Sequence, residues 1–239
     1  MSEISIVIPA YNEARRLPAT LDRIEAHLRS RGIAAEVIVV DDGSTDQTAA
    51  VVSSHARTWP ALKLVSAPVN AGKGRAVQLG MAAATGRYRV FSDADLSVPI
   101  EDIELLLKPL QSGAGVAIAS RGLKESQIEL HQPWYRETMG KIFNKLVQTF
   151  VLAGIHDTQC GFKAFSAEVA TKVFPPLQTR GFGFDVEVLY RARALGYTIV
   201  EVPTRWINSP QSRVNPIWDS SAMFLELLAI PARVRRHPG

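Results

Sequence analysis

The sequence predicts an α/β fold built on a single, mostly parallel sheet flanked by helices. Two observations support this prediction: short β-branched runs recur along the first half of the chain, and most of the gaps between them have helical periodicity. Such alternation is the signature of parallel βαβ units. No glycine-rich dinucleotide fingerprint follows any run, which makes an ordinary dinucleotide-binding fold unlikely. The predicted strands cover residues 4–8, 36–40, 62–65, 88–91 and 116–119.

The segment after the first predicted strand has the apolar spacing of an amphipathic helix. Its apolar residues, spaced to fall on one helical face, are Leu17, Leu21, Ile24 and Leu28. We expect this helix to pack on the sheet, with Asn12 capping its start. Residues typical of helix entrances also follow the second strand, at 44–46, and the fourth strand, at 99–102.

Composition points to one soluble unit. The chain has 239 residues, of which 46% are hydrophobic and 21% charged, with a net charge of +4. No apolar stretch approaches the roughly 20 residues that span a bilayer, and the N-terminus enters a predicted strand without a secretory pattern. We therefore expect a cytoplasmic protein. The lone Cys160 excludes an internal disulfide, and we expect it to pack as a small apolar group.

A D-x-D pattern, Asp93-Ala94-Asp95, closely follows the predicted strand at 88–91. Strand alternation places both carboxylates on one side of the chain, at the edge where open α/β folds bind ligands. Two carboxylates so close together are costly unless a cation neutralises them. A hard divalent ion, Mg²⁺ or Mn²⁺, meets that demand and also binds a diphosphate. We therefore predict Asp93 and Asp95 as metal ligands.

Two further strand ends carry residues suited to a nucleotide. Asp42 ends the second strand, where folds of this class read nucleoside hydroxyls or base edges. An Asx turn with helix capping accounts in part for Ser44 and Asp46. The first strand closes with an aromatic ring, Tyr11, and a carboxylate, Glu13. Together, the three strand ends predict a nucleotide pocket.

Four segments at strand ends or before helices form an ordered set of motifs. They are Ile8-Pro9-Ala10-Tyr11-Asn12-Glu13, Val40-Asp41-Asp42-Gly43-Ser44-Thr45-Asp46, Asn70-Ala71-Gly72-Lys73-Gly74 and Asp93-Ala94-Asp95-Leu96. This set strongly resembles the GT-A glycosyltransferases of family 2. Three later motifs are Trp134-Tyr135-Arg136, Asp157-Thr158-Gln159-Cys160-Gly161-Phe162-Lys163 and Phe184-Asp185-Val186-Glu187. They look like the branch of dolichyl-phosphate β-glucosyltransferases and mannose synthases, so the resemblance covers roughly residues 4–215.

The resemblance implies an inverting, metal-dependent transferase that moves a hexose from a nucleotide-diphosphate sugar to a polyprenyl or dolichyl phosphate. The implied nucleotide-binding residues are Pro9, Ala10, Tyr11, Glu13, Asp42, Lys73, Asp93 and Ala94, with Lys73 near the diphosphate. The implied metal, Mg²⁺ or Mn²⁺, lies on Asp93 and Asp95. We assign catalytic roles to Asp95, Lys73, Arg121 and Arg136.

The implied acceptor needs no strong protein base. A phosphate monoester has a second pKa near 6, so it is largely a dianion at neutral pH and can itself attack. It does need cations that hold phosphate, a task suited to the arginine fork. The candidates are Arg121 after the fifth strand, Arg136 at the start of a helix predicted over 134–152, and Arg213 in a loop resembling the family's acceptor side.

The favoured donor is UDP-glucose. Ser97 stands where mannose synthases often have glutamine, and segments 132–136 and 157–162 look closer to the glucosyltransferase branch. One alternative is a GDP-mannose-dependent polyprenyl-phosphate mannosyltransferase. Another is transfer to a saccharide hydroxyl, with Asp157 or Asp185 as general base. Polymer synthesis is disfavoured because Arg205-Trp206 lacks the preceding glutamine of the Q-x-x-R-W element.

We divide the chain into a catalytic domain over 1–215 and a C-terminal amphipathic helical tail over 216–239. Within the domain, the nucleotide-sugar half covers about 1–120 and the acceptor half about 121–215. The tail either packs on the domain or lies on anionic lipid. Its candidate lipid-contacting residues are Phe224, Leu227, Leu228, Ile230, Arg233, Arg235 and Arg236. We expect peripheral attachment to the cytoplasmic face of a membrane and no nucleic-acid partner.

Overall fold

A computed structural model describes residues 3–130, 134–207 and 218–236, and the side chains of all of these except 134–136 and 218–225. Its centre is a seven-stranded sheet with the order β3-β2-β1-β4-β7-β5-β8. The strands are β1 (Ile4–Ala10), β2 (Ala35–Asp42), β3 (Leu62–Ala67), β4 (Tyr88–Ser92), β5 (Val116–Ser120), β7 (Phe162–Ser166) and β8 (Ile199–Pro203). The five predicted strands are all confirmed.

The sheet is mostly parallel, as predicted, and β7 is the exception. This strand pairs antiparallel with β4 on one side and β5 on the other, whereas the remaining neighbours are parallel. Strands β1 and β2 read as near-continuous apolar runs because helices cover both faces of the sheet. The insertion of β7 brings a segment from late in the chain beside the end of β4.

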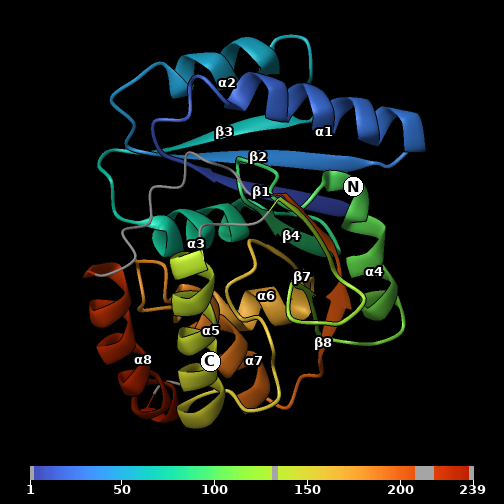
Figure 1. The fold of residues 1–239 in the computed structure, drawn as a ribbon. Helices are drawn as coiled ribbons and strands as arrows, with labels where there is room; N and C mark the ends of the chain where they lie inside the picture. The colour runs from blue at the N-terminus through green and yellow to red at the C-terminus, as the bar shows by residue number, and fades with distance from the viewer. Residues whose placement is uncertain (1–2, 131–133, 208–217, 237–239) are drawn as a thin grey trace.

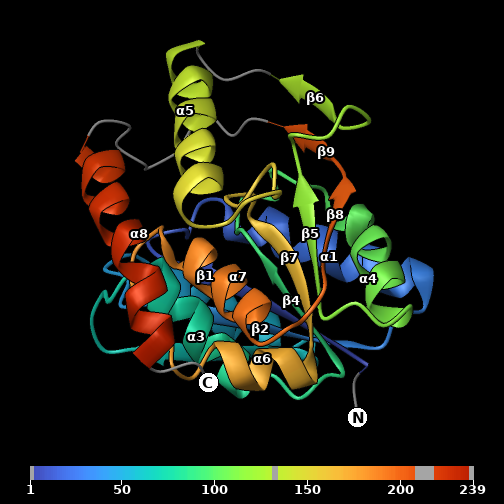
Figure 2. The ribbon, with the colours of Figure 1, turned by 90° about the horizontal axis from the view of Figure 1, so that it is seen from below.

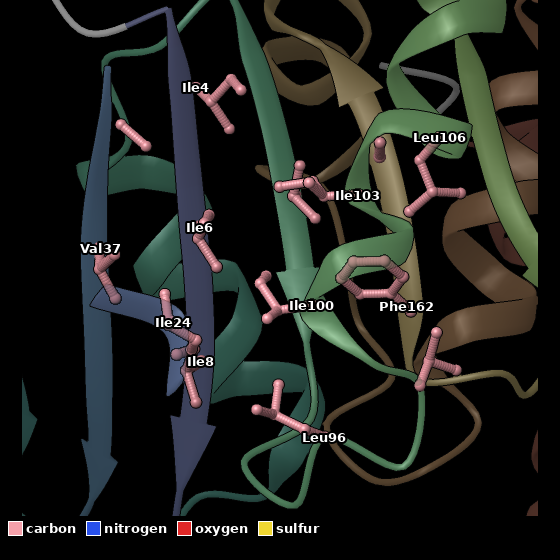
Figure 3. Packing of buried hydrophobic residues seen from close by; sticks show 14 of the residues in the cluster. Ile4, Ile6, Ile8, Ile24, Val37, Leu96, Ile100, Ile103, Leu106 and Phe162 are labelled. Atoms are coloured by element: carbon pink, nitrogen blue, oxygen red, sulfur yellow. The ribbon is translucent and has the colours of Figure 1, made fainter. Parts of the chain in front are cut away.

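Helices α1 (Leu17–Arg31), α2 (Thr48–Ala56) and α4 (Ile103–Gln111), with the short 3₁₀ turn η1 (Ile100–Asp102), cover one face of the sheet (Figure 1). The predicted apolar stripe of α1 is buried as expected. Figure 3 shows Ile24 of α1 beside Ile6 and Ile8 of β1, with Leu106 and Phe162 in the same apolar layer. This packing fixes the carboxyl ends of the central strands.

The predicted capping of this first helix by Asn12 is wrong. Helix α1 begins at Leu17, and the preceding Arg16 makes no side-chain cap. Asn12 instead has a positive φ of 53°, and its side-chain oxygen accepts a hydrogen bond from the backbone of Thr45, 2.8 Å away. A contact across more than thirty residues thus replaces the expected local one.

The opposite face is covered by α3 (Lys73–Ala83), α6 (Ala167–Val173) and α7 (Phe184–Ala194), with α5 (Trp134–Phe150) and α8 (Trp218–Arg236) beyond them (Figures 1 and 2). Helix α5 confirms the predicted long helix. In α8, Leu227, Ile230 and Val234 are buried in the core, where α8 packs against α7 and α5.

The tail is therefore a packed helix in its described part, and this corrects the proposed lipid contact for two residues. Leu227 and Ile230 are fully buried, so they are not available to a bilayer in this arrangement. Leu228 is 47% exposed. Phe224 lies in α8, but its side chain is outside the described set. Within the described ranges, no helix is both long and apolar enough to cross a bilayer.

A second, two-stranded parallel sheet joins β6 (Gln127–Leu130) to β9 (Arg205–Ile207) and projects beyond the end of the main sheet (Figure 2). The backbone N–H of Ile207 donates to the carbonyl of Ser97, 2.8 Å away. Arg205 is ion-paired with Asp102 at 2.8 Å. These bonds hold the small sheet next to the segment that follows β4.

Candidate active site

The first two motifs are joined by hydrogen bonds where β1 and β2 end. The backbone N–H of Asn12 donates to Ser44 Oγ at 2.8 Å, and Asn12 Oδ1 accepts from the backbone of Thr45 and Asp46. The Asx turn predicted at Asp46 is confirmed, because its Oδ1 accepts from the backbone N–H of Thr48 at 2.9 Å, whereas the N-cap residue of α2 is Gln47, which makes no side-chain cap. The strand ends expected to form a nucleotide pocket are thus neighbours in space.

Asp42 joins the second motif to the third. Its carboxylate is buried, and its two oxygens accept from the backbone N–H groups of Ala71 and Gly72, both at 2.9 Å. Gly72 has a φ of 97°, a conformation that favours glycine. An ionised carboxylate has about four acceptor positions, so this anchoring leaves capacity for a ligand.

Lys73 joins the third motif to the fourth. It is the first residue of α3, and its Nζ lies 2.6 Å from Asp93 Oδ1. Burial acts to lower the pKa of Lys73, but attraction to Asp93 and Asp185 outweighs it and raises the pKa above its usual value. The next residue, Gly74, lets the start of α3 pack closely on the Thr179 backbone, because a Cβ there would lie 2.5 Å from the carbonyl oxygen of Thr179. Lys73 is therefore a fixed positive charge at the sheet edge.

The second carboxylate of the D-x-D motif also has a cationic neighbour. Arg16 Nη1 lies 3.5 Å from Asp95 Oδ2, and Arg16 Nε lies 3.4 Å from Glu13 Oε2. The side chains of Asp93 and Asp95 are 32% and 19% exposed. Leu96, which follows the motif, has a positive φ of 46°. The charge compensation that two adjacent carboxylates require is thus supplied here by Lys73 and Arg16.

Gly161 brings the segment before β7 into contact with the D-x-D motif. The backbone N–H of Asp93 donates to the carbonyl of Gly161 at 3.0 Å. A Cβ added to Gly161 would overlap the Asp93 carboxylate. Any larger residue at this position would therefore displace one of the two predicted metal ligands.

Arg121 is held by a buried carboxylate. Its Nε and Nη2 donate to the two oxygens of Asp157 at 2.6 and 2.9 Å, and its backbone N–H donates to Oδ2 at 3.0 Å. Burial opposes ionisation of Asp157, but Arg121 outweighs that effect and lowers the pKa of Asp157. The guanidinium carbon lies 5.4 Å from the centre of the Trp206 ring. Arg121 is therefore a rigid cation whose side chain is 28% exposed.

A second buried pair lies behind the site. Lys163 Nζ is 2.5 Å from Asp185 Oδ1, and both side chains are less than 5% exposed. Lys163 also donates to the carbonyl of Cys160. Burial raises the pKa of Asp185 despite this neighbour, and it raises that of Cys160 to about 12. Cys160 thus packs as a buried neutral thiol, as predicted.

The structure brings together Glu13, Asp42, Lys73, Asp93 and Asp95 through the contacts above. The other predicted nucleotide-binding residues are near these contacts: Pro9, partly exposed, and Ala10, buried, end β1, Tyr11 follows them and is 37% exposed, and Ala94 is buried within the D-x-D motif. Arg136 lies at the start of α5, with its side chain outside the described set, and Arg213 lies outside the described residues.

Sequence reasoning missed Arg16, and it named Gly161 and Lys163 only as members of a motif, with no role of their own. The spacing of Arg16 three residues after Glu13 was the available signal for an ion pair. Across the described part of the chain, no group of three or more His, Cys, Asp or Glu side chains could hold a metal ion. A metal at Asp93 and Asp95 would therefore need further ligands from a bound molecule or water.

Comparisons with known proteins identify a family to which this chain is similar. The model for Glycosyl transferase family 2 matches residues 5–174. A dolichyl-phosphate beta-glucosyltransferase of Drosophila melanogaster is 36% identical over 97% of this chain and 75% of its own length. The Homo sapiens protein of that name is 33% identical over the same shares.

Solved structures support the fold. A glucosyl-3-phosphoglycerate synthase from Mycobacterium tuberculosis, in complex with Mn²⁺, UDP-glucose and phosphoglyceric acid, matches with a TM-score of 0.71 and 22% identity. The match covers 97% of this chain and 79% of that one. The mostly parallel sheet flanked by helices is thus a GT-A fold, as predicted. Together with the family match, this shows that the chain belongs to glycosyl transferase family 2.

Proposed function

We propose that this chain transfers glucose from UDP-glucose to a polyprenyl phosphate such as dolichyl phosphate, with inversion at the anomeric carbon. The observation that carries the proposal is the convergence of Lys73, Asp93 and Asp95 with the ends of β1 and β2 at one sheet edge. The names of the relatives that match most of the chain support the sugar and the acceptor class.

Asp93 and Asp95 would hold a Mg²⁺ or Mn²⁺ ion. Their carboxylates are partly exposed, and a hard cation bound there would complete its shell with diphosphate oxygens and water. The Mn²⁺ and UDP-glucose in the mycobacterial neighbour support this assignment. When bound, the ion stabilises the negative charge of the departing diphosphate.

Lys73 serves the same leaving group. Its ammonium lies beside Asp93 at the start of α3, within reach of any diphosphate that these carboxylates help to bind. A positive charge already in place stabilises the charge that develops when the glycosidic bond breaks, with little reorganisation. Lys73 thus lowers the barrier to departure of UDP.

The nucleoside lies against the ends of β1 and β2 in this proposal. The partly exposed ring of Tyr11 offers a stacking face, and the carboxylates of Glu13 and Asp42 can accept hydrogen bonds from hydroxyl or base N–H groups. Pro9 and Ala10 at the end of β1, and Ala94 in the D-x-D motif, form the backbone around this pocket.

The acceptor phosphate is its own nucleophile. As a dianion it attacks the anomeric carbon directly, on the face opposite the departing diphosphate, so an α-linked donor gives a β-linked product. Arg121, Arg136 and Arg213 hold the phosphate. Because Asp157 fixes the guanidinium of Arg121, little side-chain entropy is lost when phosphate binds.

Buried ion pairs disfavour transfer to a saccharide hydroxyl. That reaction needs a general base with access to the acceptor and a pKa near the working pH. Asp157 is 2% exposed, and Arg121 holds its pKa low. Asp185 is 4% exposed and faces Lys163. Neither carboxylate is placed to take a proton from a substrate.

Because a polyprenyl phosphate stays in the bilayer, the protein must come to a membrane surface. We propose peripheral, reversible attachment at the cytoplasmic face, using the exposed Leu228, Arg235 and Arg236 of α8. Ile128 and Leu130 of β6 are 37% and 49% exposed and form a second candidate surface. Each basic residue near an anionic surface contributes about 1 kcal/mol.

A donor panel tests the proposal. The purified chain is incubated with UDP-glucose, UDP-galactose, GDP-mannose or GDP-glucose, Mn²⁺ and a short-chain polyprenyl phosphate, and lipid-linked sugar is quantified. We expect one donor, UDP-glucose, to dominate by orders of magnitude, because a site built to hydrogen-bond one base rejects another strongly. Preference for GDP-mannose would contradict the donor assignment while leaving the mechanism in place.

A further inference from the structure

Arg16 lies between two carboxylates that the proposed reaction needs for different purposes. It is 3.5 Å from Asp95, a proposed metal ligand, and 3.4 Å from Glu13, a proposed nucleoside contact. On the other side of the D-x-D motif, Lys73 is 2.6 Å from Asp93. Each carboxylate of the motif therefore already has a cation of the protein beside it.

In the ion pair between Arg16 and Asp95, the guanidinium can be replaced by a metal ion. The two side chains are 22% and 19% exposed, and their 3.5 Å separation is longer than a charge-assisted hydrogen bond. Partly solvated ion pairs of this geometry contribute little free energy, so a divalent ion can displace the guanidinium at modest cost. Glu13 offers the displaced guanidinium a second partner and keeps it beside the site.

We propose that Arg16 is a displaceable counter-ion of the metal site, an inference that rests on the proposed function. In the ligand-free protein Arg16 balances the charge of Asp95. When a divalent cation and a nucleoside diphosphate bind, the cation replaces Arg16 beside that carboxylate. Arg16 is a positioning residue, because it acts through Asp95 and touches no reacting atom. Its charge makes the site a poor binder of a bare divalent ion.

This arrangement couples the metal to the nucleotide. A bare ion must displace Arg16 and Lys73 and then lies beside two positive charges. A bound diphosphate provides negatively charged oxygens with which Arg16 and Lys73 can pair. The ion and the nucleotide therefore each tighten the binding of the other, by the same factor. Removing the charge of Arg16 should therefore strengthen binding of the bare ion and reduce the coupling.

Calorimetric titration of Mn²⁺, with and without saturating UDP, tests the inference without relying on turnover. For Arg16→Gln without UDP we expect Mn²⁺ to bind about tenfold more tightly, the scale of one unit charge beside a partly solvated site. We also expect a smaller gain on adding UDP. Arg16→Lys keeps the charge and should stay close to wild type.

Arg15→Gln is the matched control, because Arg15 is the preceding residue, has the same charge and is exposed. It should leave the Mn²⁺ affinity unchanged. Circular dichroism and thermal unfolding establish that each variant is folded. Unchanged or weaker Mn²⁺ binding by folded Arg16→Gln would overturn the counter-ion role alone. Failure of wild type to bind Mn²⁺ even with UDP would overturn both that role and the metal assignment of the proposed function.

Discussion

Two sets of ion pairs lie around the same end of the sheet, and they differ in solvent access. On the donor side, the pairs of Lys73 with Asp93 and Arg16 with Asp95 have side chains that are 19–32% exposed. On the acceptor side, Asp157 and Asp185 are 2% and 4% exposed beside their cations.

This difference in exposure distinguishes ion pairs whose cation a ligand can replace from ion pairs that stabilise the fold. Partly exposed pairs contribute little stability, whereas leaving a buried charge without its partner costs several kcal/mol. The donor-side carboxylates can therefore exchange a protein cation for a metal ion and a diphosphate. Asp157 accepts bonds from the backbone N–H groups of Arg121 and Gln159 and holds the Arg121 guanidinium, whereas Asp185 pairs with the buried Lys163.

The largest expected effect is loss of turnover at the exchangeable pair. We predict that Asp95→Ala lowers kcat/KM for UDP-glucose by about 10³-fold or more, equivalent to roughly 4 kcal/mol of transition-state stabilisation. Its thermal unfolding should stay close to wild type. The control is Asp22→Ala, an exposed carboxylate on α1. Full activity in Asp95→Ala, or undiminished wild-type activity in EDTA, would remove the metal from the mechanism.

At the structural pair, the expected loss is in stability. Asp157→Asn should lower the free energy of unfolding by about 3 kcal/mol, because an asparagine amide cannot accept all three bonds that the buried Asp157 carboxylate accepts from Arg121. Asp93→Asn should cost less than about 1 kcal/mol, since its pair is partly exposed. Urea unfolding measures both values. Equal losses at the two positions would contradict the distinction between the two sets.

A smaller effect concerns Glu36, a buried carboxylate of β2. It accepts hydrogen bonds from Ser5, Lys63 and Thr85, which outweigh the opposing effect of burial and lower its pKa from 4.5 to about 2. Because the folded pKa lies below the unfolded one, its stabilisation is complete above about pH 4.5 and is lost as the pH falls toward 2.

We therefore expect Glu36→Gln to cost on the order of 2 kcal/mol at pH 7. The difference from wild type should shrink when unfolding by urea is repeated at pH 4 and pH 3. A difference independent of pH would show that Glu36 stabilises the fold through packing and not through its charge.

The smallest expected effect is on membrane attachment. The double variant Leu228→Ser, Arg235→Gln should weaken co-sedimentation with anionic liposomes by about 1–2 kcal/mol at low salt and by less at high salt. Leu105→Ser, a change at an exposed leucine of α4, is the control. Unchanged binding by the double variant would move the attachment surface to Ile128 and Leu130 of β6.

Periodicity predicted the parts of the fold that depend on local pattern. The five β-branched runs and the apolar face of α1 needed only sequence spacing. Strand β7 was missed because its place between β4 and β5 depends on pairing with strands far away in sequence. Asn12 was assigned a local cap for the same reason, since its partners lie in the loop after β2.

In the candidate site too, the sequence predicted what depends on local pattern and missed what depends on distant contacts. The position of Asp93 and Asp95 at a strand end follows from alternation, so the sequence alone predicted it. Their counter-ion Arg16 did not stand out, because an arginine at the start of a helix reads as an ordinary surface residue. The buried lysine of β7 was recognised as part of a motif, yet its pairing with Asp185 requires the three-dimensional fold.

The central claim, that a phosphate dianion displaces UDP from glucose without a protein base, is tested most directly by the structure of the product. The chain is incubated with UDP-[1-¹³C]glucose, Mn²⁺ and either a short polyprenyl phosphate or the corresponding alcohol, and the anomeric signal is followed by NMR. We predict a β-glucosyl phosphate from the phosphate and no product from the alcohol. An α-linked product, or equal transfer to the alcohol, would contradict the mechanism.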